Sequence, residues 1–408
     1  MREFLVLFRQ YLPGSKRRQM HDMRQLIMRK RHMPLWCFFV FFSAFSASPI
    51  GAAAPDDTPH KSAILIEAET GQVLKVHRPD AQHIPASIVK MMLMLLVAEG
   101  VERGAFSLND EVTTSPEASR MGGSQVFLKH DERFPLSALF KALSIASAND
   151  AAFAIAEHLA GTSESMVSLM NQRARELGMK NTHYESVHGL PPDPGKRPDY
   201  TTAYDTALLG REIVKHPLIL KQTRIWKDTF RGGRFTLYNT NRTLLRTFNG
   251  MDGIKTGYFK EAGFNICATA VRDGMRLIAV VLGSPRSKQR TRETRKLLLE
   301  GFRLYRKMKL FAVLEKTGRS LPVEGGEKKT VRATPARGVA VVVKRLRAPG
   351  ITTHLQVPLP IKAPVKKGDR LGEIEARLGK KVLAKVDLLA AEDVPEMGWL
   401  QWLMFWNR

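Results

Sequence analysis

The order of apolar and polar residues along the chain predicts a mixed fold of strands and helices. Residues 62–77 contain two short apolar stretches around the turn Glu-Thr-Gly-Gln, which predicts a pair of strands. An apolar run rich in Met and Leu, 87–101, is long enough for a buried helix. Helical patterns follow at 136–160 and 163–177, so the middle of the chain is predicted to be helical.

Beyond this helical middle the pattern becomes that of antiparallel strands. A capping-box-like start at Thr202 predicts a helix to about His216. Arg272-Asp-Gly-Met275 has the composition of a two-residue hairpin turn. Three strands and a basic helix are predicted at 251–257, 263–271, 275–283 and about 287–307. We therefore expect an α/β (α+β) fold, in which helices pack on an antiparallel sheet and a helical lobe is inserted between its first and last strands.

The C-terminal part of the chain has a different pattern of apolar residues and turns. After about Leu310, short strand-like pieces are separated by Gly and Pro, which predicts a small all-β domain. These pieces are Val339–Val343, Thr353–Val357, Arg370–Ile374 and Lys381–Val386. At the end of the chain, three Trp and one Leu share a helical face, namely Trp399, Trp402, Leu403 and Trp406. Such a helix can lie in a membrane interface, or it can pack on the β-domain.

The first 53 residues have the organisation of a secretory signal peptide. Basic residues from Arg24 to Arg31 precede an uncharged run that starts at Met33, and small residues follow. We expect cleavage after Ala53 and a protein secreted to the periplasm, with an uncleaved anchor as the alternative.

Composition narrows the class of protein further. The chain has 408 residues, of which 44% are hydrophobic and 25% charged, so it is neither a disordered polymer nor a many-span membrane protein. Two cysteines exclude a disulfide-stapled scaffold, and Cys267 is expected to be a buried apolar residue because it lies in a predicted strand. The net charge is +25, of which the signal segment carries +7, which leaves +18. This basicity indicates an anionic partner, but secretion and the dispersed Lys and Arg argue against nucleic acid.

Three short motifs carry candidate chemistry. Ser87-Ile-Val-Lys90 opens the first long helix, where a spacing of three puts the hydroxyl and the ammonium on one face. Lysine can act as a base only if burial or a nearby cation lowers its pKa. By itself the motif is equally typical of a helix start with Ser as the cap.

The second motif is Ser147-Ala-Asn149, whose polar side chains interrupt a helical stretch of small apolar residues. A similar Ser107-Leu-Asn109 lies in a turn and is attributed to a surface loop.

The third motif, Lys255-Thr-Gly257, lies in a predicted strand. There Gly257 allows a ligand to lie against the backbone, while Lys255 and Thr256 offer a charge and a hydroxyl to a carboxylate. The same tripeptide at 316–318 lies in the β-rich tail and is treated as a coincidence.

Together, Ser-x-x-Lys, Ser-x-Asn and Lys-Thr-Gly form the signature set of the penicilloyl-serine transferases. The chain resembles the low-molecular-mass penicillin-binding proteins, the serine-type D-alanyl-D-alanine carboxypeptidases. Further stretches carry the resemblance across the chain after the signal segment: Pro85–Met92, Phe127–Lys129, Asn181–Tyr184, Val187–Leu190 and Asp252–Gly257. The resemblance implies a β-lactamase/transpeptidase-like catalytic domain, followed by the small β-domain and a terminal amphipathic helix.

The resemblance also implies a role for each motif residue. Ser87 would attack the carbonyl of the penultimate D-alanine and Lys90 would take its proton, while Ser147 would relay a proton to the leaving nitrogen. The substrate amide would be oriented by Asn149, and the N–H groups of Ser87 and Tyr258 would hold the oxyanion. The remaining substrate-binding residues are Lys255, Thr256, Gly257 and Arg290, of which Arg290 falls where the family places an arginine thought to support carboxylate binding. Many relatives have His at the position of Tyr258.

These observations lead to an expected organisation and function. The expected parts are a signal peptide (1–53), a catalytic domain (54–308), a β-sandwich domain (309–392) and a membrane-associating helix (393–408). The expected activity removes the terminal D-alanine of peptidoglycan pentapeptide stems through an acyl-serine, with β-lactams as covalent inhibitors and the outer face of the inner membrane as the attachment site. No cofactor is expected, and no metal site, because no His/Asp/Glu cluster was found with ligand spacing.

Three alternatives remain open at this point. A DD-endopeptidase would use the same site. A β-lactamase would need a carboxylate to activate water, and Glu185 lies in Glu-Ser-Val-His-Gly instead of the Glu-x-x-Leu-Asn that such enzymes use. A protein that binds peptidoglycan with vestigial catalysis is the third.

Overall fold

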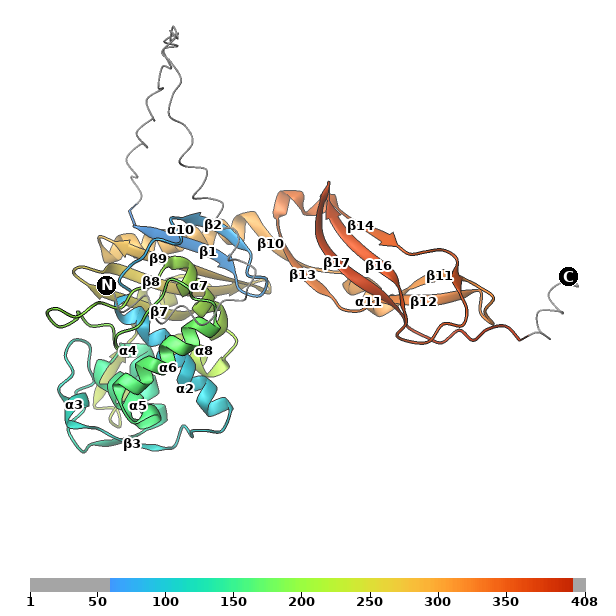
Figure 1. Ribbon diagram of the computed structural model, residues 1–408. Helices are drawn as coiled ribbons and strands as arrows, with labels where there is room; N and C mark the ends of the chain where they lie inside the picture. Colours follow the sequence, from blue (N-terminus) through green and yellow to red (C-terminus); the bar gives the residue numbers. More distant parts are fainter. Residues whose placement is uncertain (1–58, 399–408) are drawn as a thin grey trace, which may run out of the picture. The chain divides into compact units, whose positions relative to one another are not determined.

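The computed structural model describes residues 59–398 (Figure 1). The predicted signal peptide lies outside the described residues, as do Trp399, Trp402, Leu403 and Trp406. Of the expected terminal helix 393–408, the first residues belong to the β-domain instead, since Val394 and Glu396 form β-bridges with Val365 and Gly326. Within residues 59–398, no helix has the length and apolar character needed to cross a membrane.

A five-stranded antiparallel sheet forms the centre of the catalytic domain, in the order β2-β1-β9-β8-β7. Its strands are β1 (Ser62–Glu67), β2 (Val73–His77), β7 (Met251–Phe259), β8 (Gly263–Arg272) and β9 (Met275–Ser284). The predicted hairpin is present, because Arg272 of β8 pairs with Met275 of β9. Among residues 59–398, strand β7 pairs within this sheet with β8 alone, so it ends the sheet.

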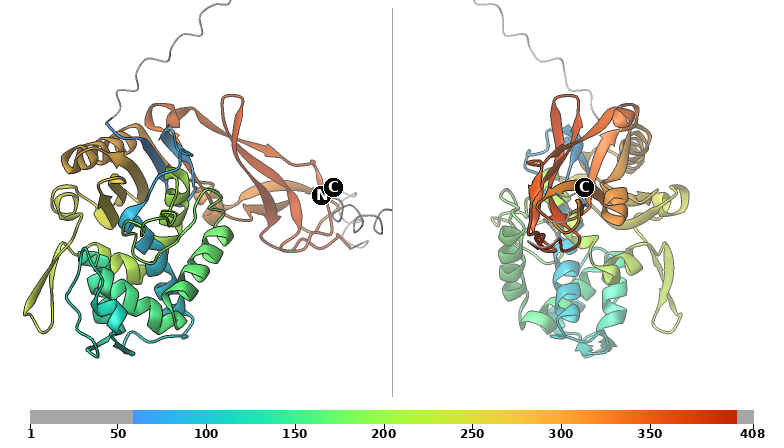
Figure 2. Two further views of the ribbon diagram at one scale, coloured as in Figure 1. Left: turned by 60° about the vertical axis from the view of Figure 1, so that its left-hand side comes forward. Right: turned by 90° about the vertical axis from the view of Figure 1, so that its right-hand side faces the viewer.

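Alternate side chains of the sheet enter two separate cores. Ala63 and Leu65 of β1 pack with the apolar face of α10 (Ser287–Leu304), whereas Ile64 and Ile66 point into the larger core of the helical lobe. This division follows from the two-residue period of a strand. The sheet is therefore covered by α10 on one face and by α2 (Lys90–Glu102) and α7 (Ala203–Ile213) on the other (Figure 2).

The helical lobe occupies the chain between β2 and β7, as the sequence predicts. Besides α2 and α7 it contains η2 (Ala86–Val89), α3 (Pro116–Ser119), α4 (Leu136–Ala146), α5 (Asn149–Ala160), α6 (Ser163–Glu176), α8 (Pro217–Thr223) and α9 (Arg242–Thr247). Strand β3 (Glu111–Thr113) pairs antiparallel with β4 (Arg133–Pro135) across a long connection that contains α3, and β5 (Lys227–Phe230) and β6 (Phe235–Tyr238) form a short hairpin.

Two predictions in this lobe were wrong in detail. The continuous helix 136–160 is two helices, because Ser147 adopts a left-handed conformation with φ +63° and ends α4. The helix 87–101 starts as the 3-10 turn η2, and α2 begins only at Lys90. The predicted cap of α7 is confirmed, since the Thr202 hydroxyl accepts a hydrogen bond of 3.0 Å from the Asp205 amide.

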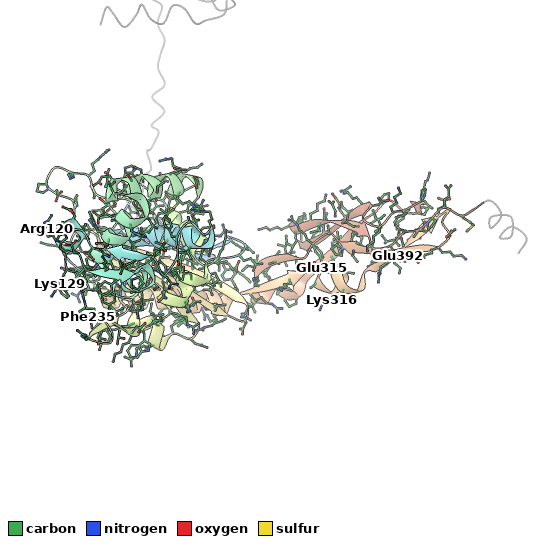
Figure 3. The ribbon with its side chains drawn as sticks, turned by 90° about the horizontal axis from the view of Figure 1, so that it is seen from below. Arg120, Lys129, Phe235, Glu315, Lys316 and Glu392 are labelled. Atoms are coloured by element: carbon green, nitrogen blue, oxygen red, sulfur yellow. The ribbon has the colours of Figure 1, made fainter. Side chains whose placement is uncertain are left out.

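The C-terminal domain is rich in strands, as predicted. Strand β10 (Tyr305–Leu310) pairs with β13 (Val339–Lys344), and a six-stranded sheet has the order β14-β16-β17-β12-β11-β15. Its members are β11 (Arg319–Glu324), β12 (Thr330–Pro335), β14 (Ile351–Gln356), β15 (Ile361–Lys362), β16 (Arg370–Leu378) and β17 (Lys381–Ala390), with the helical turns α11 (Ala312–Thr317) and η3 (Arg345–Gly350) between strands. Figure 3 shows Lys316 of the repeated tripeptide in this domain, on α11.

Candidate active site

The hydroxyl of Ser87 and the amine of Lys90 are in direct contact. Lys90 Nζ lies 3.0 Å from Ser87 Oγ and donates a second hydrogen bond of 2.6 Å to the His188 carbonyl. The 3-10 turn η2 and the first residue of α2 put both side chains on the same face, which is what the spacing of three predicts. Lys90 is fully buried, whereas Ser87 remains partly accessible to a substrate.

The surroundings of Lys90 favour its neutral form. Burial, reinforced by the positive charge of Lys255, lowers the pKa of Lys90 well below its usual value. The carboxylates of Asp199 and Asp150 oppose this shift without reversing it. A neutral amine within hydrogen-bond distance of a serine hydroxyl can accept its proton, so the pair has the geometry of a nucleophile and its base.

The backbone around Ser87 is held by close contacts with two glycines. Ala86 has φ +51°, a conformation that non-glycine residues rarely adopt. A Cβ on Gly189 would lie 2.1 Å from the Ala86 carbonyl oxygen, and one on Gly257 would lie 2.5 Å from the Pro85 oxygen. Only glycine therefore fits at either position, and strand β7 approaches the turn before Ser87 closely.

Asn265 of β8 secures the same turn through its side chain. Its Nδ2 donates to the carbonyls of Ile84 and Pro85 at 2.9 and 3.2 Å, and its Oδ1 accepts from Gly283 N at 2.7 Å. Asn265 is fully buried, so it connects the central sheet to the segment that carries the nucleophile. The sequence analysis missed this residue, although a polar side chain within a run of small and apolar strand residues was a detectable signal.

Ser147 and Asn149 lie at the junction of α4 and α5, where the chain breaks the predicted helix. The Ser147 hydroxyl and Asn149 Oδ1 are buried and have no hydrogen-bond partner within the described part of the chain. Asn149 Nδ2 donates to the Gly122 carbonyl at 2.6 Å, and the Asn149 amide donates to Ser124 O at 2.7 Å. Two unsatisfied buried oxygens are costly, which is typical of groups that await a ligand.

The neighbouring Asp150 holds a loop beside this junction. Its carboxylate accepts hydrogen bonds of 3.0 to 3.2 Å from the amides of Val126 and Leu128. Burial raises the pKa of Asp150, while these amides act in the opposite direction. The sequence analysis did not identify Asp150, whose role here is to position the loop 122–128 against α5.

Strand β7 brings a second buried lysine to the site. Lys255 is buried, its Nζ donates to the Thr256 carbonyl at 2.8 Å, and burial together with the charge of Arg290 lowers its pKa to about 7. Arg290 of α10 is itself buried, and its Nε has no hydrogen-bond partner among residues 59–398. Burial lowers the pKa of Arg290 to about 10. Such a pair of desolvated cations attracts a carboxylate strongly.

Tyr258 follows the Lys-Thr-Gly motif and directs its ring outward. Its side chain is 55% exposed and stacks on Phe264 with a centroid distance of 4.0 Å. The ring makes none of the described hydrogen bonds, which agrees with a role for the backbone N–H of Tyr258 alone. Thr256 is buried beside it on β7.

His188 and Asp199 complete the surroundings of Lys90. Burial, assisted by the charge that Lys90 carries when it is protonated, lowers the pKa of His188 to about 4, so the ring is neutral, and its Nδ1 accepts from Leu190 N at 3.1 Å. Asp199 accepts a hydrogen bond from the Ser186 hydroxyl, whose oxygen in turn accepts one from Gly189 N. These bonds fix the segment whose carbonyl receives Lys90.

Other candidate chemistry is not found at this site. Within the described part of the chain, no three His, Cys, Asp or Glu ligand atoms converge at the catalytic side chains. Cys267 is buried, as expected, and burial raises the pKa of its thiol. The site therefore offers a serine, a buried lysine with a lowered pKa, and further buried cations.

The comparison with protein families identifies two parts of the chain. Residues 50–286 match the family described as D-alanyl-D-alanine carboxypeptidase, and residues 305–396 match the C-terminal domain of penicillin-binding protein 5.

Individual relatives match most of the chain. D-alanyl-D-alanine carboxypeptidase DacF of Bacillus subtilis is 35% identical over 347 residues, which covers 84% of this chain and 88% of the relative. The crystal structure of penicillin binding protein 5 from Haemophilus influenzae has a TM-score of 0.70 and 29% identity, covering 85% of this chain and 100% of that chain. Penicillin-Binding Protein D2 from Listeria monocytogenes, solved in the ampicillin-bound form, has a TM-score of 0.55 and 28% identity, covering 61% of this chain and 100% of that chain.

Proposed function

This chain belongs to the D-alanyl-D-alanine carboxypeptidase family, and on that premise we propose that Ser87 is its nucleophile and Lys90 the base. The observation that carries the proposal is the 3.0 Å contact between Lys90 Nζ and Ser87 Oγ, together with the depressed pKa of the amine. The proposed substrate is the pentapeptide stem of peptidoglycan, from which the terminal D-alanine is removed.

The acylation step follows from the positions of these groups. Ser87 Oγ forms a bond to the carbonyl carbon of the penultimate D-alanine, and its proton passes to Lys90. The N–H groups of Ser87 and Tyr258 are the proposed donors to the oxyanion, because β7 lies against the turn that carries Ser87.

Release of the terminal D-alanine requires a proton at its nitrogen. We assign this transfer to Ser147, whose buried hydroxyl has no partner of its own among the described residues, with Lys90 as the source of the proton. Asn149 would orient the substrate amide through its unpaired Oδ1. When the C–N bond breaks, the acyl group stays on Ser87, and water then hydrolyses the ester.

Recognition of the free carboxylate is assigned to β7 and α10. Lys255 and Arg290 are both buried, so their positive charges are poorly solvated. A bound carboxylate would stabilise both charges by supplying the hydrogen bonds and the negative charge that water does not provide there. Thr256 would add a hydroxyl, and Gly257 would let the peptide lie against the strand. A requirement for a terminal carboxylate favours a carboxypeptidase over an endopeptidase.

β-Lactams are proposed as covalent inhibitors that acylate Ser87, in keeping with the ampicillin-bound form of the Listeria relative. The alternative of a β-lactamase is weakened by the surroundings of Glu185. Its carboxylate contacts His183 at 3.3 Å and Arg197 at 3.7 Å, and its backbone N–H donates to Asp199. Glu185 is the one carboxylate that the sequence analysis considered as an activator of water, and these contacts already occupy it.

Placement outside the cytoplasm remains part of the proposal. The predicted signal peptide 1–53 would direct the chain to the periplasm, and the Trp-rich end would attach it to the outer face of the inner membrane.

The decisive experiment measures D-alanine release from a diacyl-L-Lys-D-Ala-D-Ala tripeptide. Residues 54–408 should release D-alanine, whereas the Ser87→Ala variant should release none and should fail to retain a fluorescent penicillin. Equal release by the variant would refute the assignment of Ser87. If neither protein releases D-alanine while the parent retains penicillin, a cross-linked muropeptide tests the endopeptidase.

A further inference from the structure

A second group of ionisable side chains lies at the C-terminal end of α2, away from the catalytic lysine at its start. Glu99 of α2, Glu212 of α7 and His216 offer ligand atoms that all lie within 4.8 Å of one another. Glu99 is nine residues beyond Lys90, so the rise of the helix separates them by about 14 Å. The proposed reaction uses none of these three residues.

His216 is the most informative member of the group. The residue is 8% exposed, and its Nδ1 lies 2.9 Å from both carboxylate oxygens of Glu102. Its Nε2 is buried and has no hydrogen-bond partner within residues 59–398. The same Nε2 lies 3.9 Å from Glu212 Oε1, so the unsatisfied nitrogen faces the group of carboxylates.

The two carboxylates each keep one oxygen for a further ligand. Arg173 donates to Glu99 Oε1 at 2.7 Å, and Lys215 donates to Glu212 Oε2 at 2.6 Å. The other oxygens lie too far from their nearest cations for a hydrogen bond: Glu99 Oε2 is 3.8 Å from Arg103, and Glu212 Oε1 is 4.0 Å from Arg173.

The charges of the surrounding side chains leave the group acidic. Four carboxylates belong to Glu99, Glu102, Glu176 and Glu212, and three cations belong to Arg103, Arg173 and Lys215. The carboxylates of this set outnumber its Arg and Lys side chains by one, which favours a bound cation.

We propose that Glu99, Glu212 and His216 bind a divalent transition-metal ion, with zinc as the best fit. One imidazole nitrogen and two carboxylate oxygens are a ligand set that zinc accepts, and water would supply the remaining position. The Glu102 contact at Nδ1 strengthens the assignment, because a metal-binding histidine commonly donates its other N–H to a carboxylate. The ligand atoms would have to move closer by less than an ångström or so to reach zinc bond lengths of about 2.0 to 2.2 Å.

A cavity of about 540 Å³ lies beside one member of the group, since Glu99 lines it together with Glu102 and Arg173. An ion bound by Glu99, Glu212 and His216 would connect the end of α2 to the residues at and after the end of α7. Its role would be structural and separate from catalysis.

The sequence analysis expected no metal ligands, and this proposal revises that expectation. Glu212 and His216 are four residues apart, but α7 ends at Ile213 and His216 is the extended residue before α8, so their proximity is not that of one continuous helix. Glu99 lies more than a hundred residues earlier, so the sequence alone does not bring it to the pair.

The test titrates Zn²⁺ into residues 54–408, after treatment with a chelator, by calorimetry. One saturable site is expected, and the midpoint of thermal unfolding should rise with Zn²⁺ concentration. His216→Asn and Glu212→Gln should each abolish that site. Glu102→Gln, which weakens the contact at Nδ1 and removes one negative charge without touching a proposed ligand, should weaken binding by about 10- to 100-fold.

Glu176→Gln is the matched control, because it removes one negative charge from the same cluster and leaves the three ligands in place. It should retain the site with nearly unchanged affinity. Anomalous diffraction at the zinc edge should place the ion between Glu99, Glu212 and His216. Absence of saturable binding, or binding that persists in both His216→Asn and Glu212→Gln, would overturn the proposal, whatever the activity of Ser87.

Discussion

At the scale of single residues, the site is built from cations that burial has deprived of water. Lys90 and Lys255 are fully buried, and Arg290 is largely buried beside Lys255. Lys255 penalises the charged state of Lys90, and Arg290 penalises that of Lys255. In the proposed mechanism the same buried cations therefore make Lys90 a base and prepare Lys255 and Arg290 for the substrate carboxylate.

The pH dependence of kcat/KM should reflect the titration of Lys90 and of Lys255. Lys90 acts as a base only when neutral, so kcat/KM should rise as pH increases through its lowered pKa. Lys255 must be charged to hold the carboxylate, so kcat/KM should fall above a pH of about 7. In the profile of kcat this alkaline limb should move to higher pH, because the bound carboxylate raises the pKa of Lys255. The measurement is D-alanine release from the tripeptide between pH 5 and pH 10.

A matched variant assigns the alkaline limb. Lys255→Arg should stay charged around neutral pH, where Lys255 titrates, because a guanidinium has a higher intrinsic pKa than an amine and buried Arg290 next to it keeps a pKa of about 10. The decline that starts near pH 7 should therefore move to higher pH in this variant, even if the overall rate is lower. A decline that persists unchanged would mean that another group titrates there.

Asn265 should matter for rate more than for substrate binding. Its Nδ2 holds the carbonyls of Ile84 and Pro85, so Asn265→Ala releases the turn that positions Ser87. A shift of about 1 Å at the nucleophile can cost on the order of 100-fold in rate. We expect kcat and the rate of penicillin acylation to fall by about 10- to 100-fold, with a smaller change in KM.

Asn171 provides the control for this prediction. Its side chain also bridges backbone groups, the N–H and C=O of Tyr184, but it does so in α6. Asn171→Ala should lower thermal stability and leave kcat of the folded enzyme nearly unchanged. Equal losses of kcat in both variants would show that the effect is general destabilisation.

At the scale of elements, periodicity predicted where helices and strands occur but not where they break. Both corrected helices break at the site itself. Ser147 takes a left-handed conformation between α4 and α5, and Ala86 has a positive φ just before Ser87. Neither is glycine, so no local preference in the sequence announces the conformation; tertiary contacts impose it. The proposed catalytic residues could be named because their chemistry is visible in sequence motifs, whereas Asn265 and Asp150, which position backbone, belong to no such motif.

Gly189 tests how the segment 186–190 supports the nucleophile. Its φ is +72°, and an added Cβ would lie 2.1 Å from the Ala86 carbonyl oxygen. Gly189→Ala should combine about 1 to 2 kcal/mol of backbone strain with a steric clash, so the free energy of unfolding should fall by more than about 2 kcal/mol. The His188 carbonyl, which receives Lys90, should shift as well and lower kcat.

Gly195 is the matched comparison for Gly189. It has φ +82° but nothing within 4 Å of an added Cβ. Gly195→Ala should therefore show only the backbone strain, about 1 to 2 kcal/mol, and normal kcat. Chemical denaturation and D-alanine release measure both quantities, and similar losses in the two variants would contradict the role of the Ala86 contact.

At the scale of the whole molecule, the C-terminal domain has its own apolar cores. One core lies around Ile374 and Val386, and another around Val331 and Leu371. Strand positions there were predicted from turn residues, but the pairing of the strands was not. Strand β11 pairs in parallel with β15, and β10 pairs antiparallel with the distant β13. Such pairings depend on long-range packing, which a single sequence does not specify.

Membrane association is predicted to depend on the residues beyond this domain. Residues 54–408 should sediment with vesicles that contain phosphatidylglycerol, whereas residues 54–398 should bind more weakly, with the same D-alanine release. The shortened chain remains strongly basic, so its remaining binding should vanish as salt screens the charges. Burial of tryptophan is not screened, so the longer chain should stay bound in salt. Full-length protein with alanine at Trp399, Trp402 and Trp406 should behave like the shortened chain; if it still binds in high salt, another surface of the protein carries the attachment.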